Sequence, residues 1–347
     1  MSRRDATRMQ ANRFGCTMTS RQRFQIPIAL RIAARGGLWL IALCLGTGIV
    51  LAQTPAPPTT EQARASLEAG MEARLDAAER ELANDPRFKD HTKQQRRDGI
   101  EFVVGNVIFA VVHEIGHMLV SELTLPVLGH EEDAADAFAI LTGLKLGNAF
   151  SDRVLSEAAR GWFLSEHRDK KENVTTVYYD EHGLDEQRAY SIVCLMVGSD
   201  PQKFSALAEK TKLPEERQKT CQLDYRRAAS SWEQVLTPHI RRPDQPKSQV
   251  IATYADIAQY EFLKRGLSHM RLLETLAEHL SDRYVWRRPI VFEMTTCSEP
   301  GAFWDVSIHK IIVCYELAID YADLYRGYAE YEVPPPSRRI AKNAKRR

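Results

Sequence analysis

The sequence predicts an α+β fold that is mostly α-helical, with a small C-terminal β-hairpin. Between Phe102 and Leu119, apolar residues lie on almost all sides of a predicted helix, as is typical of a helix in the centre of a fold. Further stretches with helical periodicity follow this helix, whereas short β-prone runs flank Pro300-Gly301. The roughly 250 residues of this region suffice for one large core.

Residues 1–52 have the composition of a signal peptide. Arginines precede an apolar stretch, 38–52, that is too short for an ordinary membrane span and is typical of a signal h-region. Val50-Leu51-Ala52 offers a cleavage site, so Gln53 is the expected mature N-terminus, and an uncleaved signal anchor is the alternative. We therefore expect a periplasmic or secreted protein with no stable membrane span after signal cleavage.

The segment 53–84 is predicted to be a linker followed by a surface helix. Residues 54–60 are rich in Pro and Thr, and 61–83 carry apolar side chains at helical spacing. One domain is expected over 85–335, followed by a basic tail, 336–347. Beyond the central helix, helices are predicted near 131–147, 151–168, 185–198, 214–236 and 250–282.

The charge balance of the mature chain gives no reason to expect a nucleic-acid partner. The whole chain has 47 basic and 46 acidic residues, and residues 1–52 hold eight arginines and one acidic residue. The remainder is therefore net acidic, with 39 basic and 45 acidic residues. The basic tail is expected to be a solvated end rather than a binding arm.

The central helix carries the motif His113-Glu114-Ile115-Gly116-His117. Residues four apart share one face of a helix, so His113 and His117 can present their imidazoles to one metal ion. The Glu114 carboxylate can then take a proton from a metal-bound water. These residues predict a zinc-dependent hydrolase. The alternative is a buried helix with two hydrogen-bonded histidines.

A third zinc ligand is expected from the acidic start of the next helix, because catalytic zinc sites combine three protein ligands with a water. Glu132 and Asp136 are one helical turn apart. We expect Glu132 to bind the metal and Asp136 to accept the free N–H of a ligating histidine. Glu131 and Asp133 are alternative ligands, although each has an alanine one turn later, and both also suit the positive end of the helix dipole.

This pattern resembles that of thermolysin-like zinc peptidases, the gluzincins, whose third ligand is a Glu on a following helix. The gap between His117 and Glu132 is shorter than expected for thermolysin. A wider set of motifs resembles an uncharacterised bacterial family, a domain of unknown function described as metallopeptidase-like. The resemblance implies a zincin-like metallopeptidase core and a peptide or protein substrate. Its motifs are 113–117, 125–129, 131–136 and 180–188.

A peptidase also needs a donor that stabilises the oxyanion of the tetrahedral intermediate. His182 is the first candidate, because the flanking acids Asp180 and Glu181 can orient and charge it. Tyr179 and Arg188 are alternatives. Alternatively, these residues form a turn that caps the following helix and have no catalytic role.

Four cysteines remain after export, an even number in an oxidising compartment, so disulfides are expected. Local pairing favours Cys194 with Cys221 and Cys297 with Cys314. The second pair would close the hairpin predicted from the runs 290–294 and 308–313. Zinc binding by the cysteines is the alternative, but no C-x-x-C spacing supports it.

Peptidases of the zincin class, which this chain resembles, usually have an edge strand that aligns an extended substrate beside the metal. In those families this strand usually precedes the motif helix. Because the predicted hairpin comes late in the chain, a structural role is favoured for it. The sequence thus predicts an exported zinc metallopeptidase with Zn²⁺ on His113, His117 and Glu132 and with Glu114 as general base. A non-catalytic secreted zinc protein that binds or scaffolds a partner is the alternative, and no feature indicates an oligomeric state.

Overall fold

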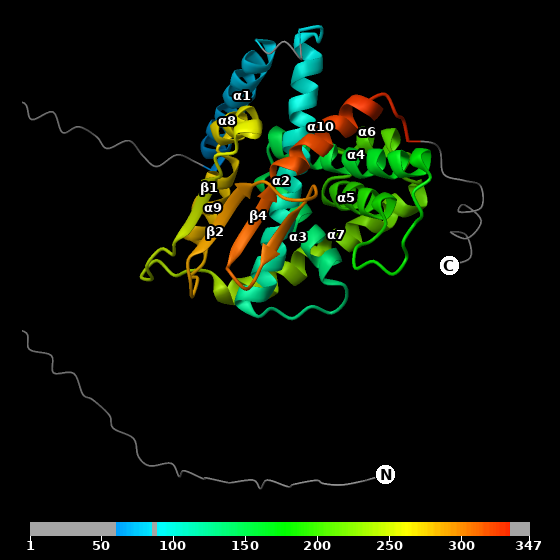
Figure 1. Cartoon of the computed structure of the whole chain (residues 1–347). Coiled ribbons are helices and arrows are strands. Elements are labelled where there is room, and N and C mark those ends of the chain that lie inside the picture. Colours follow the sequence, from blue (N-terminus) through cyan, green and yellow to red (C-terminus); the bar gives the residue numbers. More distant parts are fainter. Residues whose placement is uncertain (1–59, 85–88, 334–347) are drawn as a thin grey trace, which may run out of the picture. The chain divides into compact units, whose positions relative to one another are not determined.

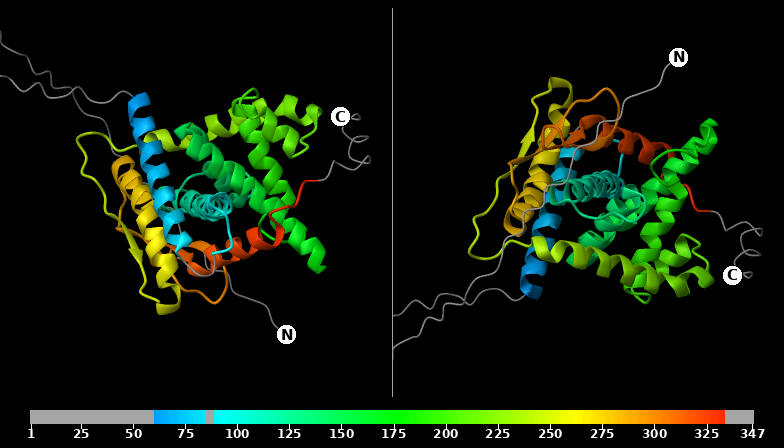
Figure 2. Two further views of the ribbon diagram at one scale, coloured as in Figure 1. Left: turned by 90° about the horizontal axis from the view of Figure 1, so that it is seen from above. Right: turned by 90° about the horizontal axis from the view of Figure 1, so that it is seen from below.

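Helix α2 (Lys93–Leu123) passes through the middle of the fold, and the other elements are arranged around it (Figures 1 and 2). The structure is a computed structural model that describes residues 60–84 and 89–333. The predicted signal peptide, the Pro/Thr-rich segment before residue 60 and the basic tail lie outside the described residues.

Two core clusters explain why α2 is apolar on all sides. Val111 and Ile115 pack into a cluster with the β-sheet, whereas Phe109 and Val112 pack into a second cluster with helices further along the chain. Among the described residues, α2 has the length and composition of a membrane span, but 72% of its most apolar window is buried inside the protein. Burial against neighbouring elements therefore accounts for its composition.

The helical layer follows α2 and confirms the helices predicted between 131 and 236. An αL residue ends α2 at Thr124, and a short loop leads to α3. Tight crossings hold this layer together: a Cβ added at Gly198 would lie 2.2 Å from the Cys221 carbonyl oxygen. The helices are α3 (Glu131–Leu146), α4 (Ala149–Glu172), α5 (Asp185–Ser199), α6 (Ser205–Lys210) and α7 (Glu215–Leu236), followed by η2 (Thr237–His239).

A four-stranded mixed sheet lies on the opposite side of α2, in the order β1-β2-β4-β3. Inward-facing residues alternate along its strands, so Phe292 and Ile311 are fully buried against α2. The strands are β1 (Val250–Tyr254), β2 (Ile290–Thr295), β3 (Ala302–Asp305) and β4 (Lys310–Cys314).

The predicted hairpin is wrong in its pairing. The runs 290–294 and 308–313 form β2 and β4, which pair in parallel, with Phe292 opposite Ile311. The chain between them forms β3, which lies antiparallel to β4 at the edge of the sheet. Parallel neighbours need a connection that crosses over, and β3 lies within that connection. The spacing of the two β-prone runs in the sequence did not reveal this crossover.

The predicted helix over 250–282 is also wrong at its start. Residues 250–254 form β1, which pairs in parallel with β2, and the β-branched residues Val250, Ile251 and Thr253 suit that environment. Then come η3 (Ala258–Tyr260), α8 (Glu261–Met270) and α9 (Leu272–Arg283), with Arg271 in the αL region between the two α-helices.

The first and last described helices both pack against α2, in different core clusters. The helix predicted over 61–83 is α1 (Thr60–Ala83), whose Met71 and Leu75 are buried against Met270 and Leu272. Helix α10 (Tyr315–Tyr328) follows β4 directly.

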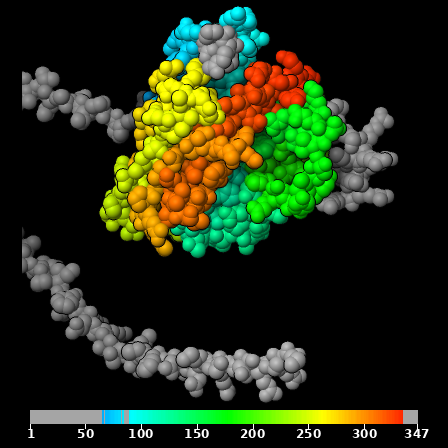
Figure 3. All heavy atoms as spheres, viewed as in Figure 1, coloured from blue at the N-terminus to red at the C-terminus, as the bar shows by residue number. Residues whose placement is uncertain are grey.

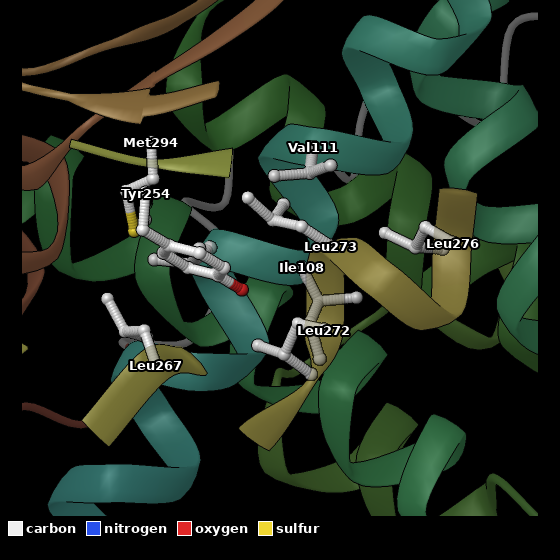
Figure 4. A pocket seen from close by; sticks show the side chains of 9 residues that line it. Ile108, Val111, Tyr254, Leu267, Leu272, Leu273, Leu276 and Met294 are labelled. Atoms are coloured by element: carbon white, nitrogen blue, oxygen red, sulfur yellow. The ribbon is translucent and has the colours of Figure 1, made fainter. Parts of the chain in front are cut away.

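A small apolar cavity of about 10 Å³, lined partly by Val111 and Tyr254, lies between α2, the sheet and α9 (Figure 4). It has room for roughly one water molecule and is a packing gap.

Both predicted disulfides are present. Cys194–Cys221 joins α5 to α7. Cys297–Cys314 joins the loop after β2 to the end of β4, so it links neighbouring parallel strands rather than the two arms of a hairpin.

Candidate metal centre

His113, His117 and Glu132 converge where α2 crosses the start of α3. The His113 and His117 Nε2 atoms are 3.0 Å apart. Glu132 Oε2 lies 3.0 Å from His113 Nε2, and its Oε1 lies 3.3 Å from His117 Nε2. The structure therefore brings together the three predicted ligands.

A close helix crossing places α3 at this point. A Cβ added at Gly116 would lie 2.9 Å from the Ala135 Cα atom, so glycine lets the two helices approach at the level of the histidines. Ala135 is fully buried. Two small residues thus set the distance between the α2 histidines and the acidic start of α3.

The donor set fits a tetrahedral metal ion. Donor atoms at about 2.0–2.1 Å from such an ion are about 3.3 Å from one another, close to the separations found here. Each histidine uses its other nitrogen elsewhere: His113 Nδ1 lies 2.7 Å from Asp136 Oδ1, and His117 Nδ1 lies 2.8 Å from Glu131 Oε1. These contacts fix both rings so that the two Nε2 atoms face one point.

A second layer of contacts holds Asp136. Arg188 donates from Nε to Oδ2 at 2.8 Å and from Nη2 to Oδ1 at 2.7 Å. The guanidinium lies 3.8 Å from the centroid of the Trp162 ring, and the Arg188 side chain is only 10% exposed. Arg188 is therefore committed to Asp136 in this structure rather than free for an oxyanion.

His182 reaches the centre from the loop between α4 and α5. Its Nε2 lies 2.9 Å from Glu132 Oε2, and its Nδ1 lies 3.0 Å from Asp180 Oδ1. Donor atoms of His113, Glu132 and His182 all lie within 4.8 Å of one another, so His182 is a further candidate ligand. Tyr179, the other sequence candidate, is 90% exposed.

The carboxylates of the centre strongly favour protonated imidazoles. Burial lowers the pKa of His117, but hydrogen bonds with Glu132 and Glu131 outweigh it and raise that pKa to about 9. The hydrogen bond with Glu132 raises the pKa of His182 above its usual value. Burial opposes ionisation of Glu132, yet its hydrogen bonds with the histidines hold its pKa far below the usual value.

Glu114 lies beside the histidines and touches the sheet. Its Oε2 accepts a hydrogen bond from the backbone N–H of Trp304 in β3, at 2.8 Å. Burial raises the pKa of this carboxyl above its usual value. A buried carboxylate with a raised pKa suits proton transfer at neutral pH.

The centre opens into a cleft of about 540 Å³. His113 and Glu114 line it together with residues of α4, the loop carrying His182, the loop before β3 and α10. In Figure 3 it is the hollow between the orange strands and the green helices. His113 and Glu114 can therefore be reached by a molecule in this cleft.

Comparison with protein families agrees with this geometry. The family model of DUF4344, described as "Putative metallopeptidase", matches residues 80–236 and 254–344. The chain belongs to the DUF4344 family. No curated protein and no solved structure matches the chain. Membership in DUF4344 supports a peptidase role and a bound metal, and the matched ranges contain every residue of the centre.

Three contacts in this DUF4344 chain were not predicted. Glu131, expected to be an alternative ligand or a partner of the helix dipole, instead contacts His117 Nδ1. The ion pair between Arg188 and Asp136 and the bond from Trp304 to Glu114 join residues 52 and 190 positions apart. Glu131 has an alanine one helical turn later, so its spacing did not indicate a contact with His117. No local pattern in the sequence indicates the ion pair between Arg188 and Asp136 or the bond from Trp304 to Glu114.

Proposed function

We propose that the protein is an exported zinc metallopeptidase that hydrolyses peptide bonds with an activated water. The observation that carries this proposal is the convergence of His113 Nε2, His117 Nε2 and the Glu132 carboxylate beside Glu114. Two nitrogens and a carboxylate form a donor set known from catalytic zinc sites. When bound, zinc supplies Lewis acidity toward the scissile carbonyl oxygen and toward the attacking water.

Glu114 is the proposed general base. Its carboxylate takes a proton from the attacking water and passes it to the leaving amine. The Trp304 N–H bonds to one carboxylate oxygen and orients the group, and burial raises the pKa of this carboxyl in the direction that suits a group that both accepts and returns a proton.

His182 is the proposed donor to the developing oxyanion. The hydrogen bond with Glu132 raises the pKa of His182 and so favours its protonated form, and an imidazolium can donate a hydrogen bond to the oxyanion and offset its negative charge. Its side chain is 47% exposed and sits on a loop, whereas His113, His117 and Glu132 project from two packed helices. We therefore assign the metal to the helix residues and the oxyanion to His182.

Strand β3 is the proposed docking edge for an extended peptide, rather than the structural ribbon favoured from the sequence. One edge of β3 pairs with β4. Backbone groups of successive residues in a strand point to opposite edges, so those of Ala302 and Trp304 face the same edge, where the Trp304 N–H reaches Glu114. Ala302 also lines the cleft. A peptide paired here by β-augmentation would lie next to the general base.

Export is part of the proposal. Two disulfides favour an oxidising compartment, which agrees with a signal peptide over residues 1–52 and a periplasmic or secreted protein. The substrate would then be an extracytoplasmic peptide or protein.

The test uses the protein from residue 53 onward, purified from the periplasm. Metal analysis is expected to give one zinc per chain, and a diverse peptide library is expected to be cut. Glu114→Gln should retain zinc and lose about 10²- to 10⁴-fold of the activity, because it keeps the shape and removes the base. Glu216→Gln, on the exposed face of α7, is the matched control and should cut normally.

A zinc-loaded wild type that leaves the whole library uncut would refute the peptidase and favour the non-catalytic binding protein. Equal activity of wild type and Glu114→Gln would remove the general-base role alone.

A further inference from the structure

The loop between β2 and β3 forms one wall of the cleft. Pro300, Gly301 and Ala302 all line it. Two residues beyond Ala302, the Trp304 N–H bonds to Glu114. The position of this loop therefore affects both the wall of the cleft and the proposed general base.

Cys314, at the end of β4, holds both ends of this loop. Its sulfur forms the disulfide with Cys297 at the start of the loop. Its backbone N–H donates to the Gly301 carbonyl oxygen at 2.9 Å, at the other end. Cys314 itself is 1% exposed in the core of the sheet, so the loop is tied to a rigid element.

Glu316, in the first turn of α10, adds a polar contact at the start of the loop. Its carboxylate accepts from Thr296 Oγ1 at 2.5 Å and from the Cys297 N–H at 3.0 Å. It also accepts from the Tyr260 hydroxyl at 2.9 Å. We call Cys297, Cys314 and Glu316 the loop clamp.

We propose that the loop clamp positions β3 against α2 and thereby sets the affinity for the peptide and the geometry of Glu114. The members of the clamp are positioning residues that act through residues 300–304. This inference rests on the proposed peptidase function for its kinetic part only, because its structural part is measurable without a substrate.

The second disulfide supplies a matched control. Cys194–Cys221 spans 27 positions and Cys297–Cys314 spans 17, so the two close loops of similar length and should stabilise the fold to a similar extent. Neither Cys194 nor Cys221 lines the cleft. A role confined to stability would make the two disulfides equivalent in their effect on catalysis.

The experiment compares Cys297→Ala/Cys314→Ala with Cys194→Ala/Cys221→Ala, both below their melting temperatures and with zinc content measured. Amide hydrogen exchange in residues 301–305 should rise about tenfold in the first variant and stay unchanged in the second. With a library peptide that wild type cuts, kcat/KM should fall about 10- to 100-fold in the first, mainly through KM. It should stay within about twofold of wild type in the second.

Glu316→Gln keeps the disulfide and serves if the first double variant does not fold. The glutamine amide has one acceptor oxygen where the carboxylate has two, so it cannot accept both from the hydroxyls of Thr296 and Tyr260 and from the Cys297 N–H, and a smaller change in the same direction is expected. Unchanged exchange at 301–305 in Glu316→Gln and in the first double variant would overturn the proposal. So would equal losses of kcat/KM in the two disulfide variants.

If wild type cuts no peptide, the peptidase proposal fails, while the exchange data still decide whether the clamp holds β3.

Discussion

Arg188 and Asp136 form a two-point ion pair behind the metal centre, with bonds of 2.8 and 2.7 Å. Because Asp136 also contacts His113 Nδ1, the guanidinium controls the orientation of a proposed zinc ligand through one intermediate residue.

Replacing Arg188 by lysine should weaken zinc binding. Lysine keeps the charge, but it cannot reproduce the planar fork or the stacking on Trp162. We expect a loss of about 10- to 100-fold in affinity, as for other outer-layer partners of metal ligands. Competition with a chelator measures it. Arg168→Lys, which alters an ion pair with Asp320, is the control, and equal affinities of the two variants would contradict the prediction.

Replacing Gly116 by alanine should separate α2 from α3. The new Cβ would lie 2.9 Å from the Ala135 Cα atom, so the backbone must move and Glu132 moves with it. We expect a loss of about 1–3 kcal/mol in the free energy of unfolding, together with weaker zinc binding. Thermal unfolding and a zinc titration test both. Gly266→Ala, with open space around its Cβ inside α8, is the control: it should leave zinc binding unchanged and raise the free energy of unfolding by about 0.5–1 kcal/mol.

Zinc affinity should rise with pH up to about pH 9. The pKa of His117 is raised to about 9, so below that pH its imidazole is protonated in the metal-free protein and must release the proton on binding. Each pH unit below 9 should cost about tenfold in affinity for this one proton. Titrations at several pH values measure the slope, and an affinity independent of pH would refute this coupling.

Replacing His182 by alanine should separate catalysis from metal binding. If His182 stabilises the oxyanion, kcat should fall about 10²-fold while the zinc content stays at one per chain. Metal analysis of the variant is decisive. Loss of zinc would make His182 a ligand, which its 2.9 Å contact with Glu132 would then explain.

The parts of the centre that the sequence predicted are local in the chain. His113 and His117 share a helix, and Glu132 and Asp136 share the next, so helical periodicity alone placed each pair on one face. The cysteine pairs were also predictable, because each joins neighbouring segments.

The missed parts depend on pairing between distant segments. The parallel alignment of β2 with β4 and the place of β1 beside β2 depend on a crossover that no single stretch of sequence specifies. Trp304 reaches Glu114 through its backbone N–H, which every residue except proline carries, so no side-chain pattern could have indicated it.

The order of these segments along the chain also bears on which part of the proposed active site each stage of folding completes. All three proposed zinc ligands lie before residue 133, whereas β3 begins at Ala302. A chain that has folded only its first helices would hold the metal donors without the edge strand or the Trp304 N–H that orients Glu114. Under the proposed mechanism, efficient cleavage awaits completion of the C-terminal sheet.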